Sequence, residues 1–230
     1  MGEEKKRLPV GLENFEQIIN DNYYYVDKTG LISELIRNGG MVNLFTRPRR
    51  FGKTLNMSML EHFFSIERDQ SIYDGLEISK NKKLCEEYMG KYPVISISLK
   101  GINAATYEDA FDFAVQIMKN VAGKMQFLLE SGNLSDFDKS EYKKLLDSGM
   151  SKAVFCSGLK TLSELLEKHY GTKVVLLIDE YDVPLAKAFE NGYYEQMIFL
   201  IRSLLEQALK TNDSLKFAVM TGCMRISKES

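Results

Sequence analysis

Short apolar runs alternate along the chain with longer stretches whose apolar positions recur at helical spacing. The runs YPVISISL (residues 92–99) and KVVLLI (residues 173–178) have the length and the β-branched content of buried strands. Residues 41–46 and 216–221 are two further strand candidates. Helical spacing predicts helices over residues 12–20, 30–37, 53–65, 107–131, 159–169 and 193–210, with another helical pattern after residue 140. Strands that alternate with helices in this way predict an α/β fold with a mostly parallel sheet.

Composition and charge remove several classes of function. The formal net charge of the 230-residue chain is −2, so there is no general basic surface and we do not expect this chain to bind nucleic acid directly. No apolar run reaches the about 18 residues that span a bilayer, and the opening MGEEKKRLPVG lacks the apolar core of a secretory signal. Two histidines and three scattered cysteines form no zinc pattern. We therefore expect a cytoplasmic protein without a membrane segment.

The octet RPRRFGKT, residues 47–54, matches most of the phosphate-loop pattern G-x-x-x-x-G-K-[ST]. Gly52 lets backbone amides approach phosphate oxygens, and a helix that begins at Lys53 directs its first N–H groups and its dipole at the same oxygens. The Lys53 ammonium can reach the β- and γ-phosphates, and the Thr54 hydroxyl can bind Mg²⁺. The segment therefore predicts a nucleotide triphosphate site.

Arg47 stands where the usual loop has its first glycine. If position 47 needed a positive φ, an arginine there would be strained, so we expect the loop to follow a different path. The guanidinium groups of Arg47, Arg49 and Arg50 could then replace some amide contacts to phosphate. The competing interpretation is a basic surface turn between a strand and a helix, because a G-K-[ST] triplet alone is a weak signal.

The segment VVLLIDE, residues 174–180, supplies the second half of the predicted site. Its apolar run predicts a strand buried on both faces, which places Asp179 at the carboxyl end, where open α/β sheets bind ligands. In a P-loop fold we expect this strand beside the one that leads into the phosphate loop. We assign Asp179 to the metal and Glu180 to general-base work on a water. The alternative is that the two acids begin a solvated turn before residues 182–184.

Two residues near the end of the last predicted strand complete the set. Thr221 ends the strand at the level where a polar side chain can contact the γ-phosphate, and Arg225 follows closely. Arg225 is the candidate for stabilising transition-state charge, in cis or from a neighbouring subunit, which leaves an oligomer open. Ordinary strand-end turn chemistry explains the two residues equally well.

Five segments together resemble a known family: LPVGLENFEQIINDNYYYVDKT, RPRRFGKTLNMSML, YPVISISL, VVLLIDEYDVPL and TGCMRISKES. The family is the predicted AAA-ATPase-like domain of bacterial and archaeal proteins. The resemblance implies a P-loop NTPase core, a three-layer αβα sandwich with a mostly parallel sheet of AAA-like type. It supports Lys53 and Thr54 as ligands of the nucleotide and Mg²⁺ and Asp179 and Glu180 as the acidic pair, and it makes Arg47 a family trait.

The same resemblance bears on the two ends of the chain. Members often carry a nuclease-like domain of the PD-(D/E)XK type after this domain, so we expect a fragment that stops at Ser230 and assign it no nuclease activity. We expect residues 1–40 to form an N-terminal segment that packs near the nucleotide site. Residues 41–230 are expected to form the P-loop NTPase core, truncated at its C-terminal end.

The segment YVDKT, residues 25–29, is implied by the resemblance to lie near the nucleotide. Tyr24, Tyr25 or Phe15 could pack on the adenine, although an aromatic cluster is more often part of a core. The aspartate and threonine of the segment are also placed to cap the helix that follows.

The predicted function is that of a slow ATPase whose cycle drives a conformational switch, with ATP and Mg²⁺ as ligands. ATP is preferred to GTP because the chain has no N-K-x-D segment to recognise guanine. A nucleotide-gated interaction module with little or no hydrolysis is the alternative, and a small-molecule kinase is disfavoured because no acceptor-site motif is evident. Catalysis is assigned to Glu180, Lys53 and Arg225, and the metal to Thr54 and Asp179. The predicted nucleotide-binding residues are Arg47, Arg49, Arg50, Phe51, Gly52, Lys53, Thr54, Leu55 and Thr221.

Overall fold

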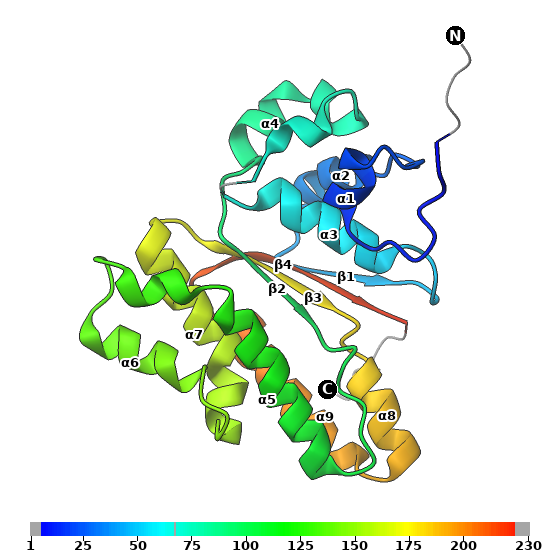
Figure 1. Ribbon diagram of the computed structural model, residues 1–230. Coiled ribbons are helices and arrows are strands. Elements are labelled where there is room, and N and C mark those ends of the chain that lie inside the picture. The colour runs from blue at the N-terminus through cyan, green and yellow to red at the C-terminus, as the bar shows by residue number, and fades with distance from the viewer. Residues whose placement is uncertain (1–5, 67, 224–230) are drawn as a thin grey trace. The chain divides into compact units, whose positions relative to one another are not determined.

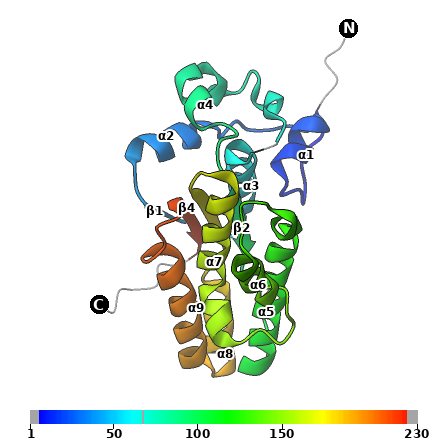
Figure 2. The same ribbon diagram turned by 90° about the vertical axis from the view of Figure 1, so that its left-hand side faces the viewer.

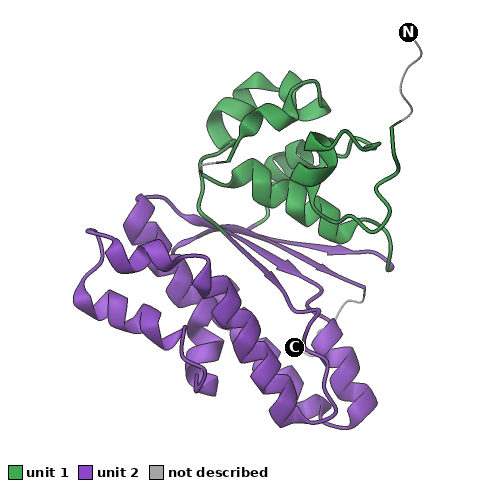
Figure 3. Ribbon diagram, in the orientation of Figure 1, with its two compact units in different colours: residues 1–40, 49–94 green, residues 41–48, 95–230 purple. Residues whose placement is uncertain are grey.

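The computed structural model describes residues 6–66 and 68–223. The chain forms two compact units (Figure 3), a smaller one of residues 1–40 and 49–94 and a larger one of residues 41–48 and 95–230. Each unit has its own set of buried apolar side chains. The predicted division into residues 1–40 and 41–230 concerns domains and stays a prediction.

The strands form one four-stranded sheet in the order β1-β4-β3-β2 (Figure 1). Its strands are β1 Val42–Thr46, β2 Val94–Ser98, β3 Val174–Asp179 and β4 Leu215–Gly222. All are parallel, and Met220 of β4 pairs with Leu44 of β1 on one side and Ile178 of β3 on the other. The predicted class is confirmed, because an all-parallel sheet flanked by helices is consistent with a P-loop NTPase-like sandwich.

The expected neighbour of β1 is wrong. β4, not β3, lies beside β1, so one strand separates the phosphate-loop strand from the strand that ends in Asp179. Parallel strands are joined by crossovers, and the place of each strand depends on where its crossover helix packs rather than on order along the chain. As a result, Thr221 and Gly222 at the end of β4 lie between the ends of β1 and β3.

β3 is the most deeply buried strand, since none of its residues is exposed or half-buried. Val174, Leu176 and Ile178 belong to the main hydrophobic core with alternate residues of β2 and β4. The intervening Val175 and Leu177 are also fully buried. Burial on both faces explains the uninterrupted apolar run that marks this segment in the sequence.

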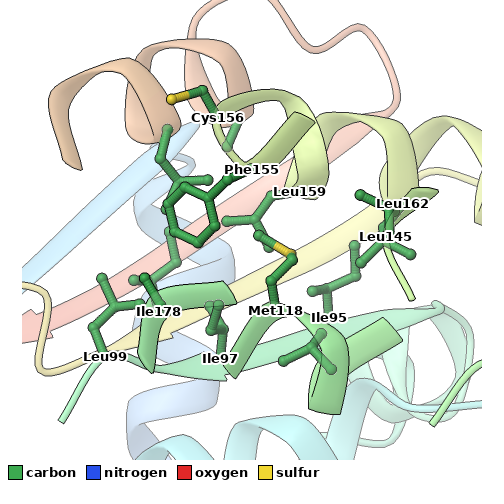
Figure 4. Close-up of a cluster of buried hydrophobic side chains, with 14 of the residues drawn as sticks. Ile95, Ile97, Leu99, Met118, Leu145, Phe155, Cys156, Leu159, Leu162 and Ile178 are labelled. Atoms are coloured by element: carbon green, nitrogen blue, oxygen red, sulfur yellow. The ribbon is translucent and has the colours of Figure 1, made fainter. Parts of the chain in front are cut away.

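Three long helices cover the core face of the sheet: α5 Tyr107–Gly123, α7 Lys152–Tyr170 and α9 Tyr194–Leu209. Figure 2 shows α7 between α9 and α5. Figure 4 shows Met118 of α5 and Leu159 of α7 within the same cluster as Ile97 of β2. Shorter helices of the larger unit are η3 Gln126–Glu130, α6 Asp136–Lys144 and α8 Val183–Asn191.

Several helices differ from the prediction in extent. The predicted helix over residues 107–131 is divided, because α5 ends at Gly123 and the short η3 follows. α7 begins earlier than predicted, at a point where the Ser151 hydroxyl accepts the Val154 N–H. α8 occupies a segment for which no helix was predicted, with Pro184 in its first turn, where the missing N–H costs no intrahelical bond.

The smaller unit packs around aromatic side chains. Phe15 and Tyr73 stack with ring centroids 5.3 Å apart, and Phe63 meets Tyr73 edge-on at the same distance. The N–H of Phe15 donates to Ser58 Oγ at 3.0 Å, which joins α1 to α3. The elements of this unit are α1 Phe15–Asn20, α2 Gly30–Asn38, α3 Lys53–Phe64, η1 Gln70–Tyr73, η2 Glu77–Lys80 and α4 Lys82–Tyr88.

Asp27 and Thr29 form a hydrogen-bonded brace in the smaller unit, which links residues 25–29 to η2. Thr29 occupies the N-cap position of α2 and is fully buried, but its hydroxyl does not cap that helix. The hydroxyl donates to Asp27 Oδ1 at 2.7 Å and accepts the Ile78 N–H at 3.1 Å. Asp27 Oδ2 accepts the Glu77 N–H at 2.7 Å. The pair therefore anchors the start of η2, a role different from the predicted helix cap.

Candidate functional site

The predicted phosphate loop follows β1 and opens α3, as the sequence indicates. The chain passes from the larger unit into the smaller one between Pro48 and Arg49. Gly52 is the N-cap residue of α3 and has φ +72°, a left-handed conformation that favours glycine. The first intrahelical bond runs from the Asn56 N–H to the Gly52 carbonyl at 3.0 Å. The N–H groups of the first turn therefore face out of the helix end, the arrangement that binds anions.

The loop follows a path that puts no left-handed strain on Arg47. Among the described residues, Arg47 is not one of those with a positive φ, whereas Arg50 has φ +69°. Arg47 instead extends the β1–β4 ladder, because its N–H donates to the Gly222 carbonyl at 3.1 Å. Its guanidinium also donates to the Thr46 carbonyl at 3.1 Å. An arginine at the first-glycine position is thus compatible with this backbone.

Burial distinguishes the basic side chains of the loop. Lys53 is only 8% exposed, which is rare for lysine, whereas Arg49 and Arg50 are exposed and Phe51 is 65% exposed. A cation at the N-terminus of a helix is unfavourable against the helix dipole. An anionic ligand bound at the same helix end would offset that cost.

The carboxyl ends of β3 and β4 carry a hydrogen-bonded pair of side chains. Asp179 and Thr221 are both buried. The Thr221 hydroxyl donates to Asp179 Oδ1, and the Leu99 N–H donates to the Asp179 carbonyl at 3.0 Å. The orientation of the Asp179 carboxylate is therefore fixed by a residue of the neighbouring strand.

Glu180 has φ +54°, a conformation that is strained for a residue with a long side chain. Its N–H points at Thr221 Oγ1 over 3.5 Å, and the Tyr181 N–H donates to the Thr221 carbonyl at 3.2 Å. Strain of this kind concentrates at functional sites, where the surrounding structure holds it. The conformation of Glu180 therefore agrees with a functional role for this residue.

The donor set of the predicted residues fits a magnesium ion. Mg²⁺ is typically held by one or two protein oxygens and takes its other ligands from phosphate and water. Asp179 offers a carboxylate at the end of β3, and Thr54 offers a hydroxyl in the first turn of α3. In the part of the chain that the structure describes, no group of three or more His, Cys, Asp or Glu side chains could hold a metal ion.

The three aromatic residues of the adenine hypothesis differ in burial, and a contact of Tyr24 or Tyr25 with adenine stays a prediction. Phe15 is fully buried in the aromatic core, so it presents no face to a base. Tyr25 donates to Met59 Sδ at 3.5 Å and accepts the Lys28 N–H at 3.2 Å, and burial raises its pKa to about 12. Tyr24 is 53% exposed.

The structure brings Asp179, Glu180 and Thr221 together at one edge of the sheet. Lys53, Thr54 and Leu55 form the first turn of α3. Arg225 lies outside the described residues. Within the described residues, no helix has the length and apolar character to cross a membrane.

A parallel sheet, a helix opened by a left-handed glycine and a buried aspartate at the carboxyl edge are features of P-loop NTPase-like α/β proteins. The chain belongs to the family described as Predicted AAA-ATPase, whose model matches residues 9–230. It is 28% identical over 228 residues to an Azotobacter chroococcum mcd 1 protein described as "Uncharacterized protein in vnfD 5'region". That match covers 98% of this chain but 39% of the relative, so the chain spans about two fifths of the relative's length. No solved structure matches the chain significantly.

Proposed function

We propose that the chain binds Mg-ATP and hydrolyses its β–γ bond slowly, and that this cycle acts as a conformational switch. The observation that carries the proposal is the left-handed Gly52 at the start of α3. Apart from its chain neighbours, no described atom lies within 4 Å of the point where a Cβ would stand on Gly52. Such an open backbone at a helix N-terminus suits a phosphate group, and the family supports nucleotide binding.

Each residue of the proposal has a separate role. The first N–H groups of α3 and the Lys53 ammonium bind phosphate oxygens, while Thr54 and Asp179 hold Mg²⁺. The ion would supply charge stabilisation for the phosphate oxygens when bound. Glu180 acts as the general base that orients a water.

In this proposal Thr221 orients the carboxylate of Asp179, a role that the position of Thr221 at the end of β4 does not by itself indicate. Its hydroxyl has one hydrogen, and that hydrogen is donated to Asp179. In this arrangement Thr221 orients the metal-binding carboxylate and cannot donate to a γ-phosphate at the same time. A contact between Thr221 and the γ-phosphate stays a prediction.

The first test replaces Lys53 by alanine. The variant should bind ATP about a hundredfold more weakly, because it loses charge-assisted hydrogen bonds of about 3 kcal/mol. Titration calorimetry with Mg-ATP measures the affinity directly. Lys83→Ala is the matched control, since Lys83 is an exposed lysine of the same unit. An unchanged affinity in Lys53→Ala would remove the phosphate-loop assignment.

The second test separates hydrolysis from binding. Glu180→Gln keeps the shape of the side chain but cannot take a proton, so turnover should fall by about 10²–10⁴-fold while ATP affinity stays near that of the parent. Steady-state phosphate release and calorimetry measure the two quantities. Equal turnover in variant and parent would exclude Glu180 as the base. ATP binding with no turnover in the parent itself would favour the nucleotide-gated interaction module.

A further inference from the structure

The turn that follows β3 is bound to the end of β4 by its backbone and by one buried carboxylate. The Val183 N–H donates to the Glu180 carbonyl at 3.2 Å and closes the turn. The Tyr181 N–H donates to the Thr221 carbonyl at 3.2 Å. Asp182 Oδ2 accepts the N–H of Cys223 at 2.8 Å. The turn and the strand end are therefore linked at two points on either side of Gly222.

Gly222 shows how closely the turn lies against β4. A Cβ on Gly222 would stand 2.7 Å from Tyr181 Cε1 and 2.8 Å from Asp182 Oδ1. Real Cβ atoms essentially never lie this close to another atom, so a larger residue here would displace the side chain of Tyr181 or Asp182. The close approach brings the Asp182 carboxylate within reach of the Cys223 N–H.

Asp182 occupies the N-cap position of α8, but its side chain makes no cap hydrogen bond to that helix. An aspartate at this position ordinarily accepts an N–H from the first turn of its own helix. Here the carboxylate, only 4% exposed, is directed to the neighbouring strand instead. Helix capping therefore does not account for this residue.

The strained Glu180 lies two residues before Asp182. A left-handed glutamate persists only where its surroundings hold it. The hydrogen bond from Glu180 to Thr221 is long, at 3.5 Å, so it restrains the backbone weakly. The Asp182–Cys223 bond, at 2.8 Å, is shorter and joins this turn to the residue that follows β4.

We propose that Asp182 is a positioning residue, which holds Glu180 in its left-handed conformation by bonding the turn to the Cys223 N–H. The proposal rests on the proposed function, in which Glu180 is the general base. Without the Asp182 carboxylate, the turn moves off β4 and the Glu180 backbone relaxes to a negative φ. The carboxylate of Glu180 then leaves the direction in which it orients a water. One sign of this role is visible in the sequence, a third acid that follows Asp179 and Glu180 and comes directly before a helix with proline in its first turn.

The test compares Asp182→Ala with Asp182→Asn in the full chain. Alanine removes the acceptor of the Cys223 N–H, whereas the asparagine carbonyl oxygen keeps one. Asp182→Ala should lower kcat for ATP hydrolysis by about ten- to a hundredfold, as expected when a catalytic group is misplaced, with ATP affinity unchanged within about twofold. Asp182→Asn should restore most of the lost kcat. A kcat in Asp182→Ala equal to that of the parent, or an Asn variant as slow as the Ala variant, would overturn the proposal.

Asp138→Ala is the matched control. Asp138 is also a buried aspartate of the larger unit, and its carboxylate accepts the Ser135 N–H at 3.0 Å and pairs with Lys168 at 2.6 Å. Its loss should reduce stability and leave kcat unchanged. A fall in kcat in this control as large as in Asp182→Ala would show that stability alone explains the effect.

Crystal structures of the parent and of Asp182→Ala give a second measurement that needs no turnover. Glu180 should have a positive φ in the parent and a negative φ in the variant. If Glu180 stays left-handed in the variant, Asp182 does not position it. If the parent hydrolyses no ATP but Glu180 relaxes in the variant, the positioning role stands and the proposed function fails.

Discussion

His62 lies in the aromatic core of the smaller unit and is only 4% exposed. Its Nε2 is 4.0 Å from Glu16 Oε2, and among the described residues neither ring nitrogen forms a hydrogen bond. Burial lowers the pKa of His62, and the Arg68 charge lowers it further. Glu16, Asp69 and Glu61 oppose these effects without cancelling them. The ring in the folded protein therefore stays neutral to a lower pH than in the unfolded chain.

The lowered pKa of His62 predicts a loss of stability in acid. Between the folded pKa and about 6.5, the unfolded chain binds more protons than the folded one. The free energy of unfolding therefore falls as pH drops below about 6.5, by up to about 1.4 kcal/mol per pH unit. His62→Phe removes this contribution, so urea unfolding at pH 7.5 and 5.5 should differ less in the variant than in the parent. His169→Gln, which keeps His62, should retain the full difference, and equal pH slopes in parent and His62→Phe would contradict the argument.

At the scale of elements, the sequence pattern predicted those features that depend only on neighbouring residues, such as the burial of a strand and the start of a helix. The apolar run of β3 identified a strand buried on both faces, and Gly52 with Lys53 located the start of α3. The position of β4 between β1 and β3 could not be predicted, because it depends on how the crossover helices pack. For the same reason the Thr221–Asp179 hydrogen bond and the strain at Glu180 are not evident in the sequence. The burial of Asp182 is likewise not evident in the sequence.

The brace formed by Asp27 and Thr29 predicts that loss of the Thr29 hydroxyl destabilises the folded protein. Burial raises the pKa of Asp27, but the hydrogen bonds from Thr29 and Glu77 lower it more, so the carboxylate is charged and strongly bonded. Thr29→Val keeps the shape but leaves the buried Ile78 N–H without its acceptor. The free energy of unfolding should fall by about 1–3 kcal/mol, as measured by urea denaturation.

Thr211→Val is the control for that brace. Thr211 is exposed, and its hydroxyl makes one hydrogen bond of 3.4 Å within its own helix end. Its replacement should change the free energy of unfolding by less than about 0.5 kcal/mol. If Thr29→Val is equally mild, the brace contributes little to the stability of the smaller unit, and a different role for this segment has to be sought.

At the scale of the whole molecule, a bound nucleotide should raise the stability of the folded chain. A ligand that binds only the folded state at about one hundred times its Kd stabilises it by about 2.7 kcal/mol. For a chain of this size that corresponds to a rise in Tm of about 5–10 °C. Because the chain has no N-K-x-D segment, Mg-ATP should produce this rise and Mg-GTP at the same concentration a smaller one.

Thermal unfolding with each nucleotide measures the preference for ATP over GTP, and the same measurement on variants tests where the nucleotide binds. Chelation of Mg²⁺ should reduce the rise with ATP, because the proposed ligands Thr54 and Asp179 act on the phosphates only through the ion. Lys53→Ala should reduce the rise with ATP to about 1–2 °C, because binding that is about a hundredfold weaker leaves the nucleotide near its Kd, and Lys83→Ala should keep the full rise. Equal rises with ATP and GTP would contradict adenine selectivity but leave the phosphate site intact. A rise in Lys53→Ala as large as in the parent would place the nucleotide elsewhere on the molecule, since a triphosphate bound at the start of α3 loses its charge-assisted bonds to Lys53 in this variant.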